Sequence, residues 1–178
     1  MSTRHQYYGQ EKLFFITTTT KNWVNIFDID SCKKVVVDSL KFCSSKYFAD
    51  IIAYVIIPNH IHVILFFQNE TKLSDFMRDF KKFSSRNIRL ELQKGKYINI
   101  LNQLEFQKGE QIYKVWQDRY DAKVIRGNEM LLTKIIYIHN NPVKNGLVLN
   151  VEDWKNSSAG FYIGLDCELP IKNAGEIM

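Results

Sequence analysis

Two short apolar runs, separated by a break that contains Pro58-Asn59, constrain the fold of this chain more than any other feature. Residues 51–57 read I-I-A-Y-V-I-I, and residues 61–67 read I-H-V-I-L-F-F. Both runs are rich in β-branched and aromatic residues, which is typical of buried strands. Because only a short turn lies between them, the two strands should pair as a β-hairpin.

Hydrophobic periodicity predicts two more strands and three helices around this hairpin. The strands are expected over residues 12–20 and 122–126, and the helices over residues 28–45, 73–86 and 129–140. Asp28 or Asp30 is the expected N-cap of the first helix, and Asn128 that of the last. Asn141-Pro142 should end the last helix, because the residue before a proline disfavours helical geometry. Residues 95–110 are polar and without a clear period, so they should form a loop.

The order of the predicted elements is strand, helix, strand, strand, helix, strand, helix, which resembles a ferredoxin-like α/β sandwich. The expected fold class is therefore α+β, with an antiparallel sheet, helices on one face and an added C-terminal helix that carries Tyr137. No repeat or low-complexity tract divides the chain. One domain over residues 1–178, with a core from about 12 to 158, is expected, and a hydrophobic content of 46% suits it.

Charge and cysteine content narrow the class of protein. A net charge of +5 is compatible with a polyanionic partner but does not demonstrate one. The three cysteines are odd in number and form no C-x-x-C pair, which argues against a disulfide framework and a cysteine zinc site. Residues 1–10 lack the apolar segment of a signal peptide, and no apolar run approaches the ~20 residues that cross a bilayer. We therefore expect a cytoplasmic protein with no membrane partner.

His60 and His62 flank Ile61 in the second run of the hairpin. Side chains alternate between faces along a strand, so both imidazoles should lie on one face and Ile61 on the other. Two imidazoles in an apolar strand are costly unless their nitrogens have partners. A divalent metal would be such a partner. Hydrogen bonds at a strand edge are the alternative.

The predicted last helix contains the run Y-I-H-N-N-P over residues 137–142. Tyr137 and Asn141 are four residues apart, so they share one face of that helix. Taken alone, the pair is more typical of a buried tyrosine and an asparagine at a helix end.

Basic residues occur in two places that could contact nucleic-acid phosphates. The predicted second helix carries Lys81, Lys82, Arg86 and Arg89 between its apolar positions. These four side chains could follow a DNA backbone, or they could simply be a solvated helix face. Arg119 lies in the segment W-Q-D-R-Y-D and Arg126 ends the predicted fourth strand. Both could contact phosphates, and a turn anchored by Trp116 before an edge strand is the alternative.

Three segments taken together are far more specific than any one of them. They read Y-V-I-I-P-N-H-I-H-V-I-L, then W-Q-D-R-Y-D, then Y-I-H-N-N-P-V-K-N-G-L-V. In order and spacing they resemble the REP-associated branch of the single-tyrosine HUH transposases, in which HUH denotes histidine, hydrophobic residue, histidine. Trp154 and Ser157-Ser158 also resemble the closing segment of that family, so the resemblance covers about residues 14–158. Residues 95–111 are longer than the usual connection and have no assigned role.

The resemblance implies a role for each matched residue. Tyr137 matches the catalytic tyrosine, His60 and His62 match the metal-binding pair, and Asn141 matches a third metal ligand. It also implies a homodimer that acts on hairpin-forming single-stranded DNA. The tyrosine of such an enzyme attacks a phosphate, and the 5′-phosphotyrosine then allows rejoining without ATP. The implied metal is Mg²⁺ or Mn²⁺, of which Mn²⁺ suits two imidazoles better.

Three other interpretations of the same residues stay open. A domesticated relative would keep the chemistry without mobilising its own gene. A non-catalytic module on the same fold would bind nucleic acid independently of Tyr137. A metal-dependent hydrolase would use the two histidines and attack with water in place of the tyrosine.

Overall fold

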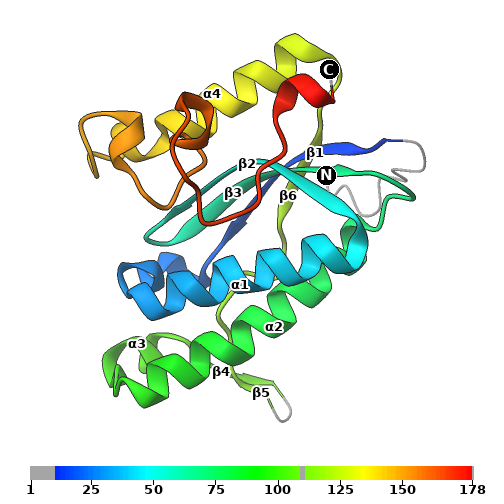
Figure 1. The fold of residues 1–178 in the computed structure, drawn as a ribbon. Coiled ribbons are helices and arrows are strands. Elements are labelled where there is room, and N and C mark those ends of the chain that lie inside the picture. The colour runs from blue at the N-terminus through cyan, green and yellow to red at the C-terminus, as the bar shows by residue number, and fades with distance from the viewer. Residues whose placement is uncertain (1–10, 109–110, 178) are drawn as a thin grey trace.

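A computed structural model describes residues 11–108 and 111–177 of the chain (Figure 1). The strands and helices run, in order, β1 (Leu13–Thr19), α1 (Asp30–Tyr47), β2 (Ala49–Ile57), β3 (His60–Phe67), α2 (Leu73–Lys94), α3 (Ile98–Gln103), β4 (Glu105–Lys108), β5 (Gln111–Tyr113), β6 (Asp121–Val124) and α4 (Asn128–Lys144). Short 3₁₀ turns connect or follow these elements. In the described part of the chain, no helix is both long and apolar enough to cross a membrane.

The main sheet confirms the predicted hairpin and the ferredoxin-like order of strands. Its four strands lie in the order β2-β3-β1-β6, and each neighbouring pair is antiparallel. β2 and β3 are joined through Pro58-Asn59, as the sequence predicts. The antiparallel α+β class with an added last helix is therefore confirmed.

The two faces of this sheet bury different layers. The odd-numbered residues of β3, which are Ile61, Val63, Leu65 and Phe67, belong to the core shared with α1 and α2. Ile64 points the other way and packs with Leu131, Ile135 and Ile138 of α4. Figure 1 shows this arrangement, with α1 and α2 on one side of the sheet and α4 on the other. The strand period of two thus assigns each side chain of β3 to one layer.

Residues 95–110, expected as a loop, instead contain α3 and β4, and β4 pairs with β5. The expectation is wrong because this segment has an apolar side of its own. Leu101 and Leu104 are buried in the core of α1 and α2, and Ile100 packs against it. A helix as short as α3 cannot be recognised from the spacing of its apolar residues alone, because its stability depends on the partner surface that buries it.

The predicted helix ends differ from the observed ones. Ile29 occupies the N-cap of α1 without a side-chain hydrogen bond, and Asp30 lies inside the first turn. Gly127, rather than Asn128, occupies the N-cap of α4. Pro142 does not end α4, because the helix continues to Lys144. The proline ring is buried, and its carbonyl still accepts a hydrogen bond from the Leu147 amide at 3.0 Å, so tertiary packing overrides the local preference.

The chain after α4, which has no clear period in the sequence, covers the edge of β2. The Ile56 amide donates to the Asn156 carbonyl at 2.8 Å, and the Ser158 amide donates to the Tyr54 carbonyl at 3.0 Å. Further along, the Lys172 amide donates to the Ile51 carbonyl at 2.9 Å. An open strand edge invites pairing with other chains, and these contacts cover it.

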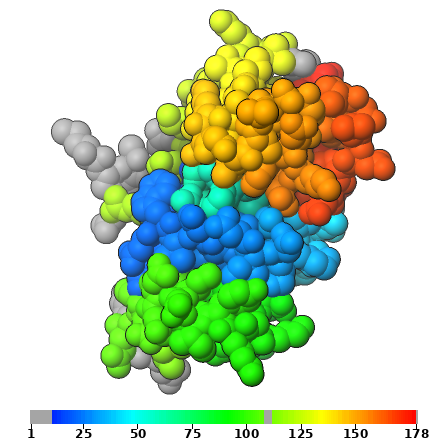
Figure 2. Space-filling model, turned by 90° about the vertical axis from the view of Figure 1, so that its left-hand side faces the viewer, coloured from blue at the N-terminus to red at the C-terminus, as the bar shows by residue number. Residues whose placement is uncertain are grey.

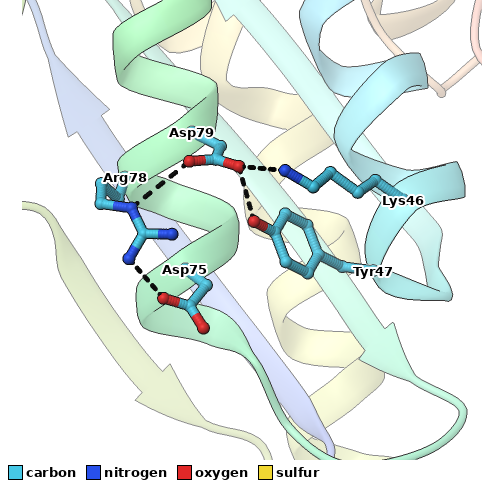
Figure 3. Close-up of polar contacts among 5 residues, drawn as sticks. All are labelled: Lys46, Tyr47, Asp75, Arg78 and Asp79. Atoms are coloured by element: carbon cyan, nitrogen blue, oxygen red, sulfur yellow. Dashed lines mark hydrogen bonds and ion pairs between the residues drawn. The ribbon is translucent and has the colours of Figure 1, made fainter.

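A buried carboxylate links α1 to α2, on the face of the sheet opposite α4 (Figure 3). Asp79 accepts hydrogen bonds from Lys46 at 2.5 Å and from the Tyr47 hydroxyl at 2.6 Å. Arg78 contacts both Asp79 and the exposed Asp75. The hydrogen bonds from Lys46 and Tyr47 lower the pKa of Asp79 to about 2.

We expect Asp79→Ala to lower the free energy of unfolding by about 1–3 kcal/mol, because Tyr47 and Lys46 lose their common acceptor. The pKa of Asp79 is lower in the fold than its ordinary value of 3.8, so ionisation favours the folded state. This contribution is complete above pH 3.8 and is lost as the pH falls from 3.8 to about 2. Denaturant unfolding at several pH values measures both effects.

Asp75→Ala is the matched control, because Asp75 makes a solvent-exposed ion pair with Arg78 on the same helix. Exposed pairs of this kind contribute ~0–1 kcal/mol. An Asp79→Ala protein that unfolds like the Asp75→Ala protein at neutral pH would contradict the prediction.

Candidate functional site

A cleft of about 530 Å³ lies where β1 and β3 face α4. Its lining comprises Phe15, Thr17, Trp23, His60, His62, Asp121, Lys123, Lys134, Tyr137, Asn141 and Asn145. These residues come from five separate segments of the chain. Figure 2 looks onto one end of the molecule, where the hairpin lies between the blue segment after β1 and the yellow and orange of α4 and the chain that follows it.

His60 and His62 lie side by side on the α4 face of β3, as strand alternation predicts. Their ring centroids are 4.8 Å apart, and the rings are nearly perpendicular. Nδ1 of His60 contacts Oδ1 of Asn59 at 2.8 Å, and Nδ1 of His62 contacts the Thr17 hydroxyl at 2.8 Å. Each Nδ1 thus has a protein partner, as is common for metal-binding histidines, and each Nε2 is the nitrogen left for another ligand.

Burial keeps these two imidazoles neutral. It lowers the pKa of His62 to about 3, with smaller contributions from the nearby His60 and Lys134. It also lowers the pKa of His60. Neutral imidazole is the form that binds a metal ion, so both rings are ready to act as ligands at neutral pH.

Asn141 lies on α4 one turn after Tyr137, on the same helix face, and its side chain contacts His62. Its Nδ2 lies 3.2 Å from Nε2 of His62, and its Oδ1 accepts a hydrogen bond from Asn145 at 3.0 Å. A half-turn of the amide exchanges these two atoms, so Asn141 can supply an oxygen beside His62. Two imidazole nitrogens and one amide oxygen form a donor set that suits a divalent ion of intermediate hardness.

The described residues of the cleft include no cluster of carboxylates that could bind a metal ion in place of the two histidines. Within residues 11–108 and 111–177, no three side chains of His, Cys, Asp or Glu gather where they could hold one ion. Mg²⁺ prefers all-oxygen ligands, whereas Mn²⁺ accepts imidazole more readily. The side chains present therefore fit Mn²⁺ better than Mg²⁺.

Tyr137 points into the same cleft from α4. Its ring centroid lies 5.3 Å from that of His62, and its side chain is 38% exposed. It also packs edge-on against Phe15, whose ring stacks on His62 at 5.4 Å. The phenol is therefore both accessible and close to the two histidines, which is the geometry that a tyrosine nucleophile beside a metal site requires.

Two lysines of α4 surround Tyr137. The Lys134 ammonium lies 5.7 Å from the centre of the tyrosine ring, and the Lys144 ammonium lies 5.5 Å from it. Lys134 also lies over Phe15 at 4.9 Å. Positive charge at this distance would favour an anionic group such as a phosphate in the cleft. Lys134 could have been found from its three-residue spacing to Tyr137, which puts both on one helix face.

A second polar cluster fastens α4 to the sheet on the side away from the cleft. Nε2 of the buried His139 lies 2.9 Å from the Ser158 hydroxyl. The same hydroxyl accepts a hydrogen bond from the Tyr54 amide at 2.9 Å. Burial lowers the pKa of His139 to about 4, so this contact involves the neutral ring. His139, which lies two residues after Tyr137, therefore has a structural role.

The basic residues predicted to bind DNA do not gather around the cleft. Lys81, Lys82 and Arg86 lie on α2, which covers the other face of the sheet (Figure 1). Lys81 donates to the carbonyls of Gln117 at 2.8 Å and Arg119 at 3.2 Å, so it anchors the segment that contains Arg119. Burial lowers the pKa of Lys81 to about 8.

Arg126 also has a protein partner, because it forms an ion pair with Glu11 at 2.7 Å. The lysines that line the cleft are instead Lys123 and Lys134, which sequence reasoning did not single out. Thr17, Phe15 and Trp23 were likewise missed. Thr17 could have been found from its register opposite His62 only once the pairing of β1 with β3 was known.

The chain is similar to a known protein family and to a bacterial relative. The profile of the family described as Transposase IS200 like matches residues 13–141. A Haemophilus influenzae protein described as a candidate REP-associated tyrosine transposase is 25% identical over 162 residues, which cover 89% of this chain and 85% of that protein.

Two solved structures share the fold. A structure described as a REP-associated tyrosine transposase bound to a REP hairpin has a TM-score of 0.69 and 21% identity, and the match covers 97% of this chain and 93% of that one. A candidate transposase from Deinococcus radiodurans R1 has a TM-score of 0.50 and 16% identity, over 79% of this chain and 97% of that one. Because the first match covers 97% of this chain, it includes most of the segment after α4.

We expect Ser158→Ala to lower the free energy of unfolding by about 1–3 kcal/mol, because both the Tyr54 amide and His139 lose a buried partner. Chemical denaturation of the purified variant measures this change. Ser44→Ala is the matched control, since the Ser44 hydroxyl is buried without a hydrogen-bond partner among the described residues. Equal unfolding free energies for the two variants would show that the cluster does not hold α4.

Proposed function

Because this chain belongs to the IS200-like transposase family, we propose that it cuts and rejoins single-stranded DNA with Tyr137 as the nucleophile. The family assignment identifies it as a DNA transposase, and so as an enzyme that cleaves DNA. The observation that carries the finer proposal is the shared cleft. The exposed phenol of Tyr137 lies 5.3 Å, between ring centroids, from the buried His62.

In the proposed first step, the Tyr137 oxygen attacks the phosphorus of a phosphodiester. The bond between phosphorus and the 3′ oxygen breaks, the phenol loses its proton to solvent, and the departing 3′ oxygen gains one. The products are a 5′-phosphotyrosine and a free 3′ hydroxyl. In the second step a 3′ hydroxyl attacks the phosphotyrosine and releases Tyr137, so the phosphodiester is restored without ATP.

A divalent ion held by His60, His62 and Asn141 would draw charge from the phosphate oxygens and orient the phosphate. Asn59 and Thr17 fix the two imidazole rings through Nδ1, so the chain orients its own ligands. We propose Mn²⁺ or Mg²⁺, and the two imidazoles favour Mn²⁺.

The lysines of α4 would act on the nucleophile itself. An ordinary phenol has a pKa near ~10 and is a weak nucleophile when protonated. Lys134 and Lys144 both lie within 6 Å of the Tyr137 ring centre, at 5.7 and 5.5 Å. Their charge stabilises the developing phenolate or the phosphate that approaches it.

The proposed substrate is single-stranded DNA that can fold into a hairpin. This is supported by the structure that shares the fold, which is described as bound to a REP hairpin. The homodimer implied by the resemblance stays a prediction.

We expect the purified protein, labelled hairpin DNA and Mn²⁺ to give a protein–DNA band that survives denaturing electrophoresis. Tyr137→Phe should abolish this band, because phenylalanine has no oxygen to bond to phosphorus. Tyr97→Phe is the control, since Tyr97 is similarly exposed, at 41%, but does not line the cleft.

The same assay separates the alternatives. A hydrolase that attacks with water would cleave DNA without an adduct, and Tyr137→Phe would leave that cleavage intact. A binding module would give neither cleavage nor adduct. Adduct formation by Tyr137→Phe would show that another residue is the nucleophile.

We expect Asn141→Ala to weaken Mn²⁺ binding by at least the ~10–100-fold that losing an outer-shell partner of a metal ligand costs, because Asn141 is proposed as a direct ligand. Asn140→Ala is the matched control, because Asn140 neighbours Asn141 but donates its amide to the Ile136 carbonyl on the helix surface. Isothermal titration of each protein with MnCl₂ measures the affinity. Equal affinities for the two variants would exclude Asn141 as a ligand.

A further inference from the structure

Trp23 forms the wall of the cleft opposite α4, and no step of the proposed chemistry uses it. It lies in a short turn directly after β1 and lines the cleft together with His60, His62 and Tyr137. Its ring meets the His60 ring edge-on, with centroids 5.8 Å apart and an angle of 80° between planes. A single edge-on contact covers at most one face of the indole, so at least one face is left by His60 for another partner, and the residue is 58% exposed.

The backbone at this position is strained. Asn22 and Trp23 both adopt positive φ angles, of 53° and 58°. For residues other than glycine this region is unfavourable, and for a bulky side chain it is a genuine outlier. Two consecutive residues in it are therefore held there by their surroundings.

The surrounding hydrogen bonds close the turn on both sides of Trp23. The buried Thr20 hydroxyl contacts the Val24 carbonyl at 2.8 Å and the Asn59 carbonyl at 2.9 Å. The Trp23 amide donates to the Thr20 carbonyl, and the Val24 amide donates to the Lys21 carbonyl, both at 3.2 Å. The Thr20 contacts tie the turn to the start of β3, so Trp23 is fixed relative to His60.

The unfavourable backbone conformation at Trp23 is not offset by burial of its side chain. Val24 and Ile26, which follow it, are buried in the core of α1 and α2 and could anchor the segment without a tryptophan. The Trp23 ring is instead mostly in solvent, where a large apolar surface is unfavourable. Strained positions of this kind cluster at functional sites.

We propose that Trp23 is a stacking platform for one unpaired base of the DNA, next to the phosphate that Tyr137 attacks. The proposal rests on the proposed function, because it places DNA in the same cleft. Lys123 and Lys134 line that cleft and can meet the backbone, while Trp23 offers the flat apolar face that a base requires. A base inside a duplex is stacked on both sides and has no free face for the indole. Trp23 therefore selects for a single-stranded nucleotide at this point.

The test measures equilibrium binding in a Tyr137→Phe background, so that cleavage does not interfere. The probes are labelled oligo(dT) and the oligo(dA)·oligo(dT) duplex of the same length. Trp23→Ala should weaken binding of oligo(dT) by about 5- to 150-fold, the range for losing one base–aromatic stack. Trp23→Phe should keep most of the affinity, and binding of the duplex should not change.

Phe48→Ala is the matched control. Phe48 is also an exposed aromatic residue with a positive φ, at 59% exposure and 50°, but it caps the C-terminus of α1 and does not line the cleft. This variant should bind oligo(dT) like its parent. Trp23→Gly separates folding from binding, because glycine tolerates the positive φ. It should unfold at a higher denaturant concentration than Trp23→Ala and bind oligo(dT) equally weakly.

Unchanged affinity of Trp23→Ala for oligo(dT), or an equal loss for oligo(dT) and the duplex, would overturn the stacking proposal. The adduct assay on the protein with Tyr137 intact reports on the proposed function separately. An adduct from the intact protein together with normal oligo(dT) binding by Trp23→Ala would reject the platform alone. Trp23-dependent binding of oligo(dT) without any adduct would support the platform and reject the nucleophile.

Discussion

The strict alternation of β3 between two cores is the constraint on which the rest of the structure depends. Ile61, Val63 and Leu65 fill the layer shared with α1 and α2, which forces His60 and His62 onto the opposite face. β3 pairs with β2 on one side and β1 on the other, so neighbours on both sides fix its register. A shift by one residue would place two imidazoles in the core of α1 and α2 and apolar side chains in the cleft. The hydrophobic core therefore sets the geometry of the site.

The position of α4 is the second requirement, and it is met by contacts that lie outside the cleft. The apolar side of the helix packs on the sheet through Leu131, Ile135 and Ile138, and His139 binds Ser158 beside the edge of β2. Tyr137 and Asn141 project from another side of the same helix toward His62. Because buried contacts hold the helix, its tyrosine can remain exposed without losing its place.

The sequence was sufficient for those parts of the site that depend on local periodicity. Alternation along β3 paired the two histidines, and four-residue spacing put Tyr137 and Asn141 on one helix face. Features that depend on tertiary contacts could not be predicted in this way. Pro142 stays helical because its surroundings bury it, and α3 forms because Leu101 and Leu104 reach an existing core. Trp23 gave no signal, since its positive φ and its place beside His60 follow from hydrogen bonds that Thr20 makes across the fold.

The basic residues show the same limit of prediction from sequence. Their positions also support the proposal that the cleft binds single-stranded DNA. The basic residues between the apolar positions of residues 73–86 suggested a DNA-binding face on α2, yet α2 lies across the sheet from the cleft, and Lys81 is used to anchor a loop. The cations near the tyrosine are Lys134 and Lys144 of α4. Positive charge thus gathers on the wall of the cleft that carries Tyr137, while Trp23 lies on another wall of the same cleft. In the proposed complex, a phosphate drawn to the wall with Tyr137 would leave its base facing Trp23, where only an unpaired base would be free to stack.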